Sequence, residues 1–526
     1  MLSARRALLF EALALAVILV LAAWLRLAGL DRTSLFGDEA VYSGQAAALA
    51  GDAAAANNFG VFLAHPVLFQ LLLGLGFAGG LPAEGGRALT ALLGVGSVVL
   101  AWAIGRFIGG RLLGLAAAVL LAVVAYDAYL SRLVLLDGPA AFVVGCSLYA
   151  YLRAEREHSG TWLAASAALL ALAVLVKETA VLILPAVAFS AAVEPRLRLS
   201  LRAWLLAAAS FATVISAFPL SLLLGGGIGS TLTYLHYQLG RHAQSAFLTY
   251  FHLIDPYVGW PFVVLAVIGL VVALWRGGSR RIIAIWAIVP GALLQAWGLR
   301  ELQLPMLVVL QGTLLCAIGI EAIGHGAAAL LARRGAGGGR RGGIASVLAA
   351  GLLVAVGLSL LPATLRTTSL PGGQPAQSGL REASQWLRDH AEPDDGVFVS
   401  TAYKVVGRRV LLGSAGIRLH PWSSARPGLP GRWRRRGLLA RRRHPVGGPG
   451  SRQPGPGDRF SRWERAVRAA PPPARRLPTR ARVSRAGPNA RSLACAGVSP
   501  DADLRSKADG RGARRDGSRR RAHRCA

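Results

Sequence analysis

The chain has 526 residues, of which 54% are hydrophobic and only 16% are charged, and its mean hydropathy is +0.47. A soluble protein of this length would carry roughly 25% charged residues. The composition, together with repeated apolar runs of about 20 residues, indicates a polytopic helical membrane protein. The net charge of +32 comes mainly from arginine in loops and in the C-terminal tail, so we do not interpret it as a sign of nucleic-acid binding. The four cysteines lack zinc-site or CxxC spacing, which argues against disulfide or thiolate-metal chemistry.

Hydropathy predicts eleven membrane-spanning helices. The first is too long for a signal-peptide core, so we expect it to be retained. A further apolar run, 66–82, is broken by prolines and rich in glycine, and is predicted to be a helix at the membrane interface. The predicted spans are 8–30, 87–107, 112–130, 133–152, 161–176, 178–193, 202–224, 260–275, 281–298, 304–324 and 344–363.

The distribution of arginine predicts the orientation of these spans. With the N-terminus in the cytoplasm, alternate connections are rich in arginine, as the positive-inside rule requires. The last span then places everything after residue 364 outside. The long outer loops 31–86 and 225–259 are the expected places for function. The predicted cytoplasmic connections are 106–111, 153–160, 194–202, 276–281 and 333–343.

The chain beyond the predicted membrane domain, 1–365, changes character at about residue 417. Residues 366–417 resemble the start of an extracytoplasmic α/β domain, with helical periodicity followed by strand character near 396–401. Residues 418–526 are rich in Arg, Pro and Gly and lack apolar periodicity, so they cannot bury enough surface to fold. We interpret this disordered tail as out-of-frame translation after a frameshift; the alternative is a basic tail that binds anionic lipid.

Two adjacent carboxylates, Asp38 and Glu39, lie directly beyond the first span. On a helix that begins here, Asp38 and Tyr42 share one face. The simpler interpretation is an ordinary acidic first turn, which the helix dipole favours. The functional interpretation is that Asp38 is a general base for a hydroxyl acceptor, since burial at a lipid boundary raises a carboxyl pKa toward a useful value.

Three more outer residues are candidates. His65 shares the first outer loop with Asp38 and is a candidate for the substrate pocket, although a lone histidine is more often structural. Arg132 and Asp137 flank the turn between the third and fourth spans, and ionisable residues at membrane depth mark functional sites by default. The alternative is an Arg132–Asp137 pair that only fixes the helix ends.

Lys177 is the only lysine in the membrane part of an arginine-biased chain, and it lies between two short spans. Lysine is a compact cation that suits a phosphate; the alternative is a turn with a local Lys177–Glu178 pair. Arg300, outside the ninth span, is a second candidate phosphate contact. The outer loop 225–259 mixes aromatic and polar residues, which suits sugar binding or an interfacial aromatic belt; its candidates are His236 and Tyr237.

At these residues the chain resembles the dolichyl-phosphate-mannose protein mannosyltransferase superfamily. It is similar in particular to bacterial glycosyltransferase family 39 members close to the aminoarabinose transferase type. The similarity covers about residues 1–416 and rests on the order and spacing of several motifs. These are Gly37-Asp-Glu-Ala-Val-Tyr42, His65-Pro-Val-Leu-Phe69, residues 86–94, Ser131-Arg-Leu-Val-Leu-Leu-Asp137, Leu175-Val-Lys-Glu-Thr-Ala180 and, more loosely, 300–305.

The resemblance implies an all-α GT-C glycosyltransferase fold in a bacterial plasma membrane, with about eleven transmembrane helices and a partial outer α/β domain. It implies inverting transfer of one sugar from a polyprenyl-phosphate carrier to a hydroxyl acceptor on the outer face. Metal dependence varies among such enzymes, so a divalent cation stays an open alternative, although no ligand cluster is evident. The implied catalytic residues are Asp38 and Glu39, the donor-phosphate contacts Arg132, Lys177 and Arg300, and the substrate pocket Tyr42, His65, Asp137, His236 and Tyr237.

Two other interpretations stay open. A transporter or lipid flippase would show ionisable residues or broken helices at mid-bilayer, often in repeated halves, and the sequence shows no such repeat. The other is an inactive, truncated homologue, because the outer domain stops in mid-pattern.

Overall fold

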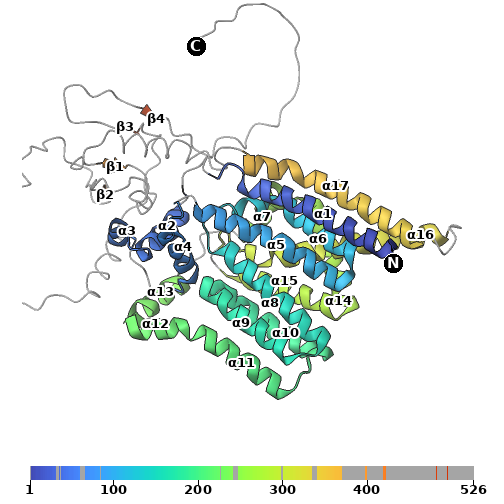
Figure 1. The fold of residues 1–526 in the computed structure, drawn as a ribbon, viewed down its shortest axis with the longest axis horizontal. Helices are drawn as coiled ribbons and strands as arrows, with labels where there is room; N and C mark the ends of the chain where they lie inside the picture. Colours follow the sequence, from blue (N-terminus) through green and yellow to red (C-terminus); the bar gives the residue numbers. More distant parts are fainter. Residues whose placement is uncertain are drawn as a thin grey trace, which may run out of the picture. The chain divides into compact units, whose positions relative to one another are not determined.

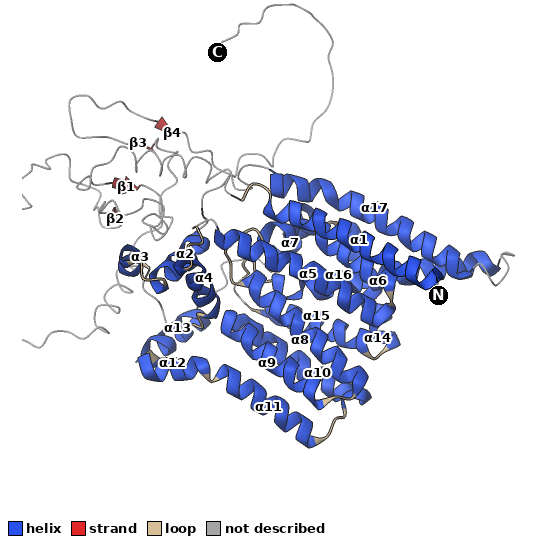
Figure 2. Cartoon of the chain, viewed as in Figure 1, coloured by secondary structure: helices blue, strands red, loops and turns tan. Residues whose placement is uncertain are grey.

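The computed structural model describes residues 2–369, apart from 31–34, 36, 60–64, 83–84, 226, 241–246, 298–299 and 334–340, and four short strands farther along the chain. The chain forms two units, one of residues 1–395 and 402–418 and the other of residues 396–401 and 419–526. The described part of the first unit is a bundle of helices (Figures 1 and 2).

The first half of the bundle contains the predicted spans up to residue 193. The predicted span 112–130 is two helices, because the backbone is extended at Val124 between them. The elements are α1 (Leu2–Leu27), α2 (Gly37–Leu49), α3 (Ala53–Asn58), α4 (Leu68–Ala78), α5 (Gly85–Gly109), α6 (Arg111–Val123), α7 (Ala125–Leu130), α8 (Asp137–Glu157), α9 (Gly160–Val176), η1 (Glu178–Ile183) and α10 (Leu184–Val193).

In the second half of the bundle, the described part of the loop predicted at 225–259 forms a helix and two short helical turns. The elements are η2 (Pro195–Leu197), α11 (Leu201–Ile215), α12 (Ala217–Gly225), α13 (Ile228–Gly240), η3 (Thr249–Leu253), η4 (Ile254–Val258), α14 (Trp260–Arg276), α15 (Ser279–Ala296), α16 (Met306–Arg333) and α17 (Arg341–Ser369).

Five described helical segments are long and apolar enough to cross a membrane, and a sixth candidate is the sharply bent pair 249–258 and 260–276. This number is lower than the eleven predicted spans for physical reasons. The helices α6, α9 and α10 are apolar but short. The helix α8 is long enough, but it begins with Asp137 and ends in a charged turn. The five long segments are Arg5–Leu27, Gly85–Gly109, Leu201–Leu224, Met306–Leu331 and Gly343–Thr368.

Close helix packing in the core depends on glycine at one crossing. A Cβ atom on Gly269 of α14 would lie 1.8 Å from the Leu315 carbonyl oxygen of α16. A Cβ atom on Gly319 would lie 2.1 Å from the Leu265 carbonyl oxygen. Small residues at such crossings let membrane helices approach closely. The core around this crossing draws buried apolar residues from α1, α5, α6 and α8 as well as α14–α16.

The described part of the loop predicted at 31–86 folds into three short helices, α2, α3 and α4, which lie together at one end of the bundle (Figure 1). The predicted interfacial run 66–82 contains α4, whose Phe69 and Leu73 are buried while Leu72 and Leu75 are exposed. This amphipathic character suits a helix lying along a membrane surface. We call this end of the bundle the α2 end.

Most of the predicted C-terminal segments lie outside the described residues, including the helical stretch of the predicted α/β domain and nearly all of the tail. The strand predicted near 396–401 is present as β1 (Val397–Val399), which pairs in parallel with β2 (Leu419–Pro421). A second pair, β3 (Ala481–Arg482) and β4 (Ala494–Cys495), is antiparallel. The domain boundaries at 365 and 417 stay predictions.

Candidate active site

Asp38 occupies the first turn of α2, as the sequence predicted, and its side chain is half-buried. The N-terminal end of a helix carries a partial positive charge that stabilises a carboxylate there. Tyr42, one turn later, is also half-buried and packs against two small apolar clusters that include Phe69 and Tyr126. Asp38 therefore lies, partly exposed, at the start of a helix that is fixed by apolar packing.

Glu39 is completely buried and is bound to two other elements. Its Oε1 accepts a hydrogen bond from Arg87 Nε at 2.8 Å, and its Oε2 accepts one from an Arg87 terminal nitrogen at 2.8 Å. Its Oε1 also accepts a hydrogen bond from the Val134 backbone N–H at 2.9 Å. Arg87 in turn donates to the Leu30 carbonyl oxygen at 2.7 Å. Glu39 thus ties α2 to α5 and to the turn before α8.

Lys177 forms an ion pair with a residue that the alternative interpretation, a local Lys177–Glu178 pair, did not name. Lys177 ends α9 and contacts Asp137, the first residue of α8, with Nζ at 2.7 Å from Oδ1 and 2.6 Å from Oδ2. Both residues are buried. The charges of Glu178 and Glu301 also act on Asp137, so this pair lies in a neighbourhood of several ionised groups.

Arg132 binds the end of α1, and not Asp137 as the simpler interpretation had it. Its terminal nitrogens donate to the carbonyl oxygens of Leu25 at 2.9 Å, Ala28 at 2.8 Å and Gly29 at 3.4 Å. Carbonyl groups at a helix C-terminus have no partner within the helix. A cation is favoured there by the dipole as well.

Arg300 makes direct contact with the loop predicted at 225–259. The Arg300 guanidinium lies 5.4 Å from the centre of the Phe247 ring and donates to the Gln295 carbonyl oxygen at 2.8 Å. Arg300 also acts electrostatically on Tyr250, whose hydroxyl is buried.

The positions of the remaining predicted pocket residues give less support for a substrate contact. His65 Nδ1 lies 2.9 Å from the Pro66 carbonyl oxygen, so the ring turns toward its own backbone. His236 is exposed on α13. Tyr237 also belongs to α13, but its side chain lies outside the described residues.

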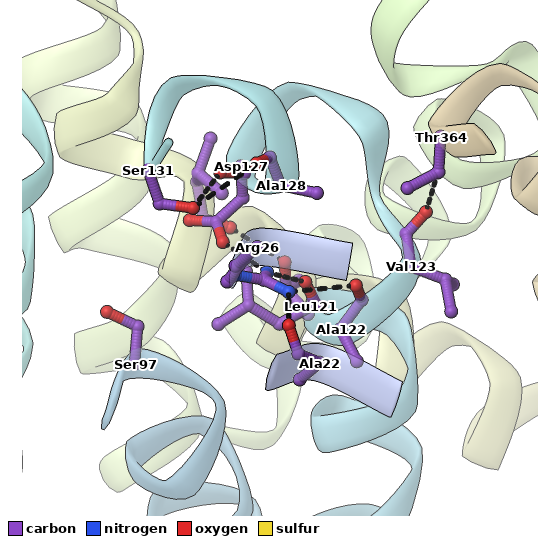
Figure 3. A network of polar contacts seen from close by, with 12 residues as sticks. Ala22, Arg26, Ser97, Leu121, Ala122, Val123, Asp127, Ala128, Ser131 and Thr364 are labelled. Atoms are coloured by element: carbon purple, nitrogen blue, oxygen red, sulfur yellow. Dashed lines mark hydrogen bonds and ion pairs between the residues drawn. The ribbon is translucent and has the colours of Figure 1, made fainter. Parts of the chain in front are cut away.

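Sequence reasoning missed Arg26 and Asp127, which form a buried ion pair (Figure 3). The Arg26 guanidinium lies 2.6 Å from Asp127 Oδ2 and also donates to the carbonyl oxygens of Leu121 at 2.8 Å and Ala122 at 3.1 Å. Both charges fall inside predicted apolar spans, and that was the signal that could have found them.

Two tyrosines join α7 to segment 300–305 and to η4. The Tyr126 hydroxyl donates to the Leu302 carbonyl oxygen at 2.6 Å. The Tyr126 and Tyr257 rings make an edge contact with their centroids 6.4 Å apart. Segment 300–305 and the loop 225–259 therefore reach the same end of the bundle as α7. In the described ranges, no group of three or more His, Cys, Asp or Glu side chains is arranged to hold a metal ion.

Comparison with known proteins agrees with the resemblance seen in the sequence. The model of the dolichyl-phosphate-mannose-protein mannosyltransferase family matches residues 64–221. This segment includes Arg87, Arg132, Asp137 and Lys177, and it begins after Asp38. A search of the curated proteins finds no match.

Solved structures of similar fold cover most of the chain. ArnT from Cupriavidus metallidurans bound to undecaprenyl phosphate has a TM-score of 0.54 at 16% identity, over 78% of this chain and 85% of that one. The chain has the GT-C fold. The apo state of the same ArnT also has a TM-score of 0.54. The Archaeoglobus fulgidus oligosaccharyltransferase, tethered with an acceptor peptide, has a TM-score of 0.52 at 12% identity, over 78% of this chain and 63% of that one. The predicted fold class is confirmed.

Proposed function

We propose that this GT-C protein is a membrane glycosyltransferase that moves a sugar from a polyprenyl-phosphate carrier to a hydroxyl acceptor. The reaction would take place on the outer face of a bacterial plasma membrane, with the N-terminus of the chain in the cytoplasm. The observation that carries the proposal is the α2 end itself. There a half-buried carboxylate, Asp38, stands at a helix N-terminus beside an anchored Glu39, and the buried Lys177–Asp137 pair lies at the same end. ArnT, which has this fold, has been solved with undecaprenyl phosphate, and this supports the class of donor.

In the proposed reaction, Asp38 takes the proton of the acceptor hydroxyl as its oxygen attacks the anomeric carbon. The bond from that carbon to the phosphate oxygen breaks, and the bonding electrons leave with the polyprenyl phosphate. Attack from the side opposite the phosphate inverts the configuration. Cations near the leaving group stabilise the charge that develops there. Asp38 suits the role of base because it is a half-buried carboxylate in the first turn of α2. Glu39 is completely buried and is bound by Arg87 through both of its oxygens. We therefore assign Glu39 to positioning α2.

Lys177 and Arg300 are the proposed donor-phosphate contacts. Lys177 Nζ binds both oxygens of Asp137, so this carboxylate holds the ammonium group in place before the phosphate arrives. Arg300 is tied to the second outer loop through Phe247. Binding of an anionic headgroup between them would draw that loop toward α8 and α9.

The donor role of Lys177 can be tested by steady-state kinetics. Lys177→Ala is expected to raise the KM for the donor about 10- to 100-fold, because one charge-assisted hydrogen bond to phosphate is worth roughly 1.5–3 kcal/mol. The KM for the acceptor should change less than about twofold. Asp137→Asn/Lys177→Met, which removes both charges, controls for the cost of a buried unpaired carboxylate. A donor KM equal to that of the wild type in both variants would contradict the assignment.

The proposed activity is tested by offering the purified protein, in lipid nanodiscs, a panel of polyprenyl-phosphate sugars that carry a radiolabel in the sugar. We expect at least one donor to release its polyprenyl phosphate and pass the label to an acceptor. In sealed vesicles, a flippase would move the labelled donor across the bilayer with its glycosyl-phosphate bond intact. Such movement without any cleavage would reject the proposal.

A further inference from the structure

Two arginines that act in opposite directions bind the end of α1 to the end of α6 and to the turn that follows α7. Arg26, in the last turn of α1, donates to the carbonyl oxygens of Leu121 and Ala122 in the last turn of α6. Arg132, just beyond α7, donates to the carbonyl oxygens of Leu25 and Ala28 at the end of α1. Each arginine therefore satisfies helix-end carbonyl groups that have no partner in their own helix.

This clamp of Arg26 and Arg132 lies where the chain departs from regular helix. The helix α6 ends at Val123, and α7 begins two residues later. Thr364 of α17 donates a hydrogen bond to the Val123 carbonyl oxygen (Figure 3). Asp127 of α7 holds the Arg26 guanidinium from the other side at 2.6 Å. The break between α6 and α7 is thus bound by side chains from α1, α7 and α17.

Arg26 is also packed closely against α5 and against the turn that follows α7. A Cβ atom on Gly94 of α5 would lie 2.6 Å from Ser131 Cβ and 3.1 Å from Arg26 Cδ. The Ser131 hydroxyl donates to the Asp127 carbonyl oxygen at 2.6 Å. Only a residue without a side chain leaves room for the arginine stem and this turn together. The close packing of α5 therefore holds the Arg26 stem and the turn at Ser131 in place, and this effect does not depend on the ion pair of Arg26 with Asp127.

The clamp connects directly to the proposed catalytic residues. The segment that follows α1 leads to Asp38, and the segment that follows Arg132 leads to Asp137. A third link joins the same two segments, since the Val134 N–H donates to Glu39 Oε1 at 2.9 Å. Three polar links thus hold residues 22–39 against residues 121–134.

We propose that Arg26 and Arg132 are positioning residues that fix the distance between the base Asp38 and the donor-binding pair Asp137–Lys177. The catalytic part of this inference rests on the proposed function. It gives Arg132 a different role from the donor-phosphate contact implied by the resemblance. A misplacement of about 1 Å can lower the rate of an enzyme about 100-fold, so such a clamp acts on kcat and leaves the affinity for the donor nearly unchanged.

The test uses the full chain in nanodiscs, with Arg132→Gln, Arg26→Lys and the double variant Arg26→Gln/Asp127→Asn. The double variant removes both buried charges together, so that neither is left unpaired. The matched control is Arg111→Gln, which removes an arginine bound to Glu11 at 3.1 Å on a distant turn. Two quantities are measured for each variant: backbone hydrogen exchange over residues 22–45 and 121–136, and kcat and KM for the polyprenyl-phosphate sugar that the wild type turns over.

We expect Arg132→Gln to speed exchange over residues 22–45 about tenfold, because local opening becomes easier when one contact is lost. The changes at Arg26 should do the same over residues 121–136. In each case kcat should fall at least about tenfold with donor KM changed less than about twofold. The Arg111→Gln control should alter neither segment.

Three results would overturn the inference. Unchanged exchange in the partner segment would show that the clamp does not hold it. Faster exchange with wild-type kcat would show that the clamp does not position the reacting groups. A loss confined to donor KM in Arg132→Gln would make Arg132 a phosphate contact instead. If no donor is turned over at all, the proposed function fails, while the exchange measurement still decides whether the clamp exists.

Discussion

The two ends of the helix bundle both bury carboxylates, but they pair them in different ways. At the Glu11 end, defined by Glu11, Glu155 and Glu194, the acids are buried and their arginine partners reach toward solvent. Glu155, for example, pairs at 3.5 Å with Arg196, whose side chain is 65% exposed. At the α2 end both members of each pair are buried, in Arg26–Asp127, Arg87–Glu39 and Lys177–Asp137. Arg26 and Glu11 lie on the same helix, roughly 22 Å apart along its axis.

This difference shows at which end of the bundle ion pairs hold side chains in fixed positions. At the Glu11 end only the carboxylate is fully desolvated, because its arginine partner keeps part of its hydration. Burying both partners costs several kcal/mol for each ion, and only well-aligned hydrogen bonds offset that cost. The α2 end meets this condition, because Glu39 and Asp137 each receive two hydrogen bonds from one cation. Fixed, buried pairs of this kind are what a preorganised site requires.

The largest loss of stability is expected when one member of a buried ion pair at the α2 end is removed. Arg87→Ala leaves the Glu39 carboxylate buried without its cation, which is expected to cost about 3–5 kcal/mol of stability. Thermal unfolding in detergent measures the loss. A shift in Tm no larger than that of a surface substitution would show that the Arg87–Glu39 pair is replaced easily by other contacts.

A smaller loss of stability is expected when a methyl group is added to the tight packing around the clamp. Gly94→Ala places a methyl group 2.6 Å from Ser131 Cβ, and overpacking of this degree costs about 1–3 kcal/mol. Gly312→Ala in α16 is the matched control, since nothing lies within 4 Å of the added atom. Equal stability of the two variants would mean that α5 moves aside without cost.

The smallest loss of stability is predicted when an arginine partner is removed at the Glu11 end. Arg196→Gln removes an exposed partner of Glu155, whose other oxygen accepts a hydrogen bond from Ser279 at 2.6 Å. Solvent-exposed ion pairs contribute about 0–1 kcal/mol, so the variant should unfold within a few degrees of the wild type. A loss as large as that of Arg87→Ala would remove the distinction between the two ends.

The sequence predicted the features that depend on local pattern. Apolar runs located the long helices, and the position of Asp38 directly after the first span placed it in the first turn of α2. Lys177, which the sequence placed between two short spans, lies buried at the end of α9. Each of these depends on residues close together in the chain.

The contacts that organise the site depend on distant residues. Arg26 and Asp127 are 101 positions apart, and only the packing of α1 against α6 and α7 brings them together. Sequence reasoning treated Asp38 and Glu39 as one catalytic pair. In the structure, Arg87 and Val134 bind the completely buried Glu39, while Asp38 lies half-buried in the first turn of α2. The break at Val124 was likewise hidden, since the residues on both sides of it are equally apolar.

The central claim is that Asp38 is the base at the α2 end, and one substitution tests it most directly. Asp38→Asn keeps the shape of the side chain and removes its ability to take a proton. We predict that transfer from the preferred polyprenyl-phosphate sugar falls about 100- to 10,000-fold in kcat, while Tm and donor KM stay near the wild-type values. Glu11→Gln, at the opposite end of α1, should retain most of the wild-type kcat. Full transfer by Asp38→Asn would contradict the account.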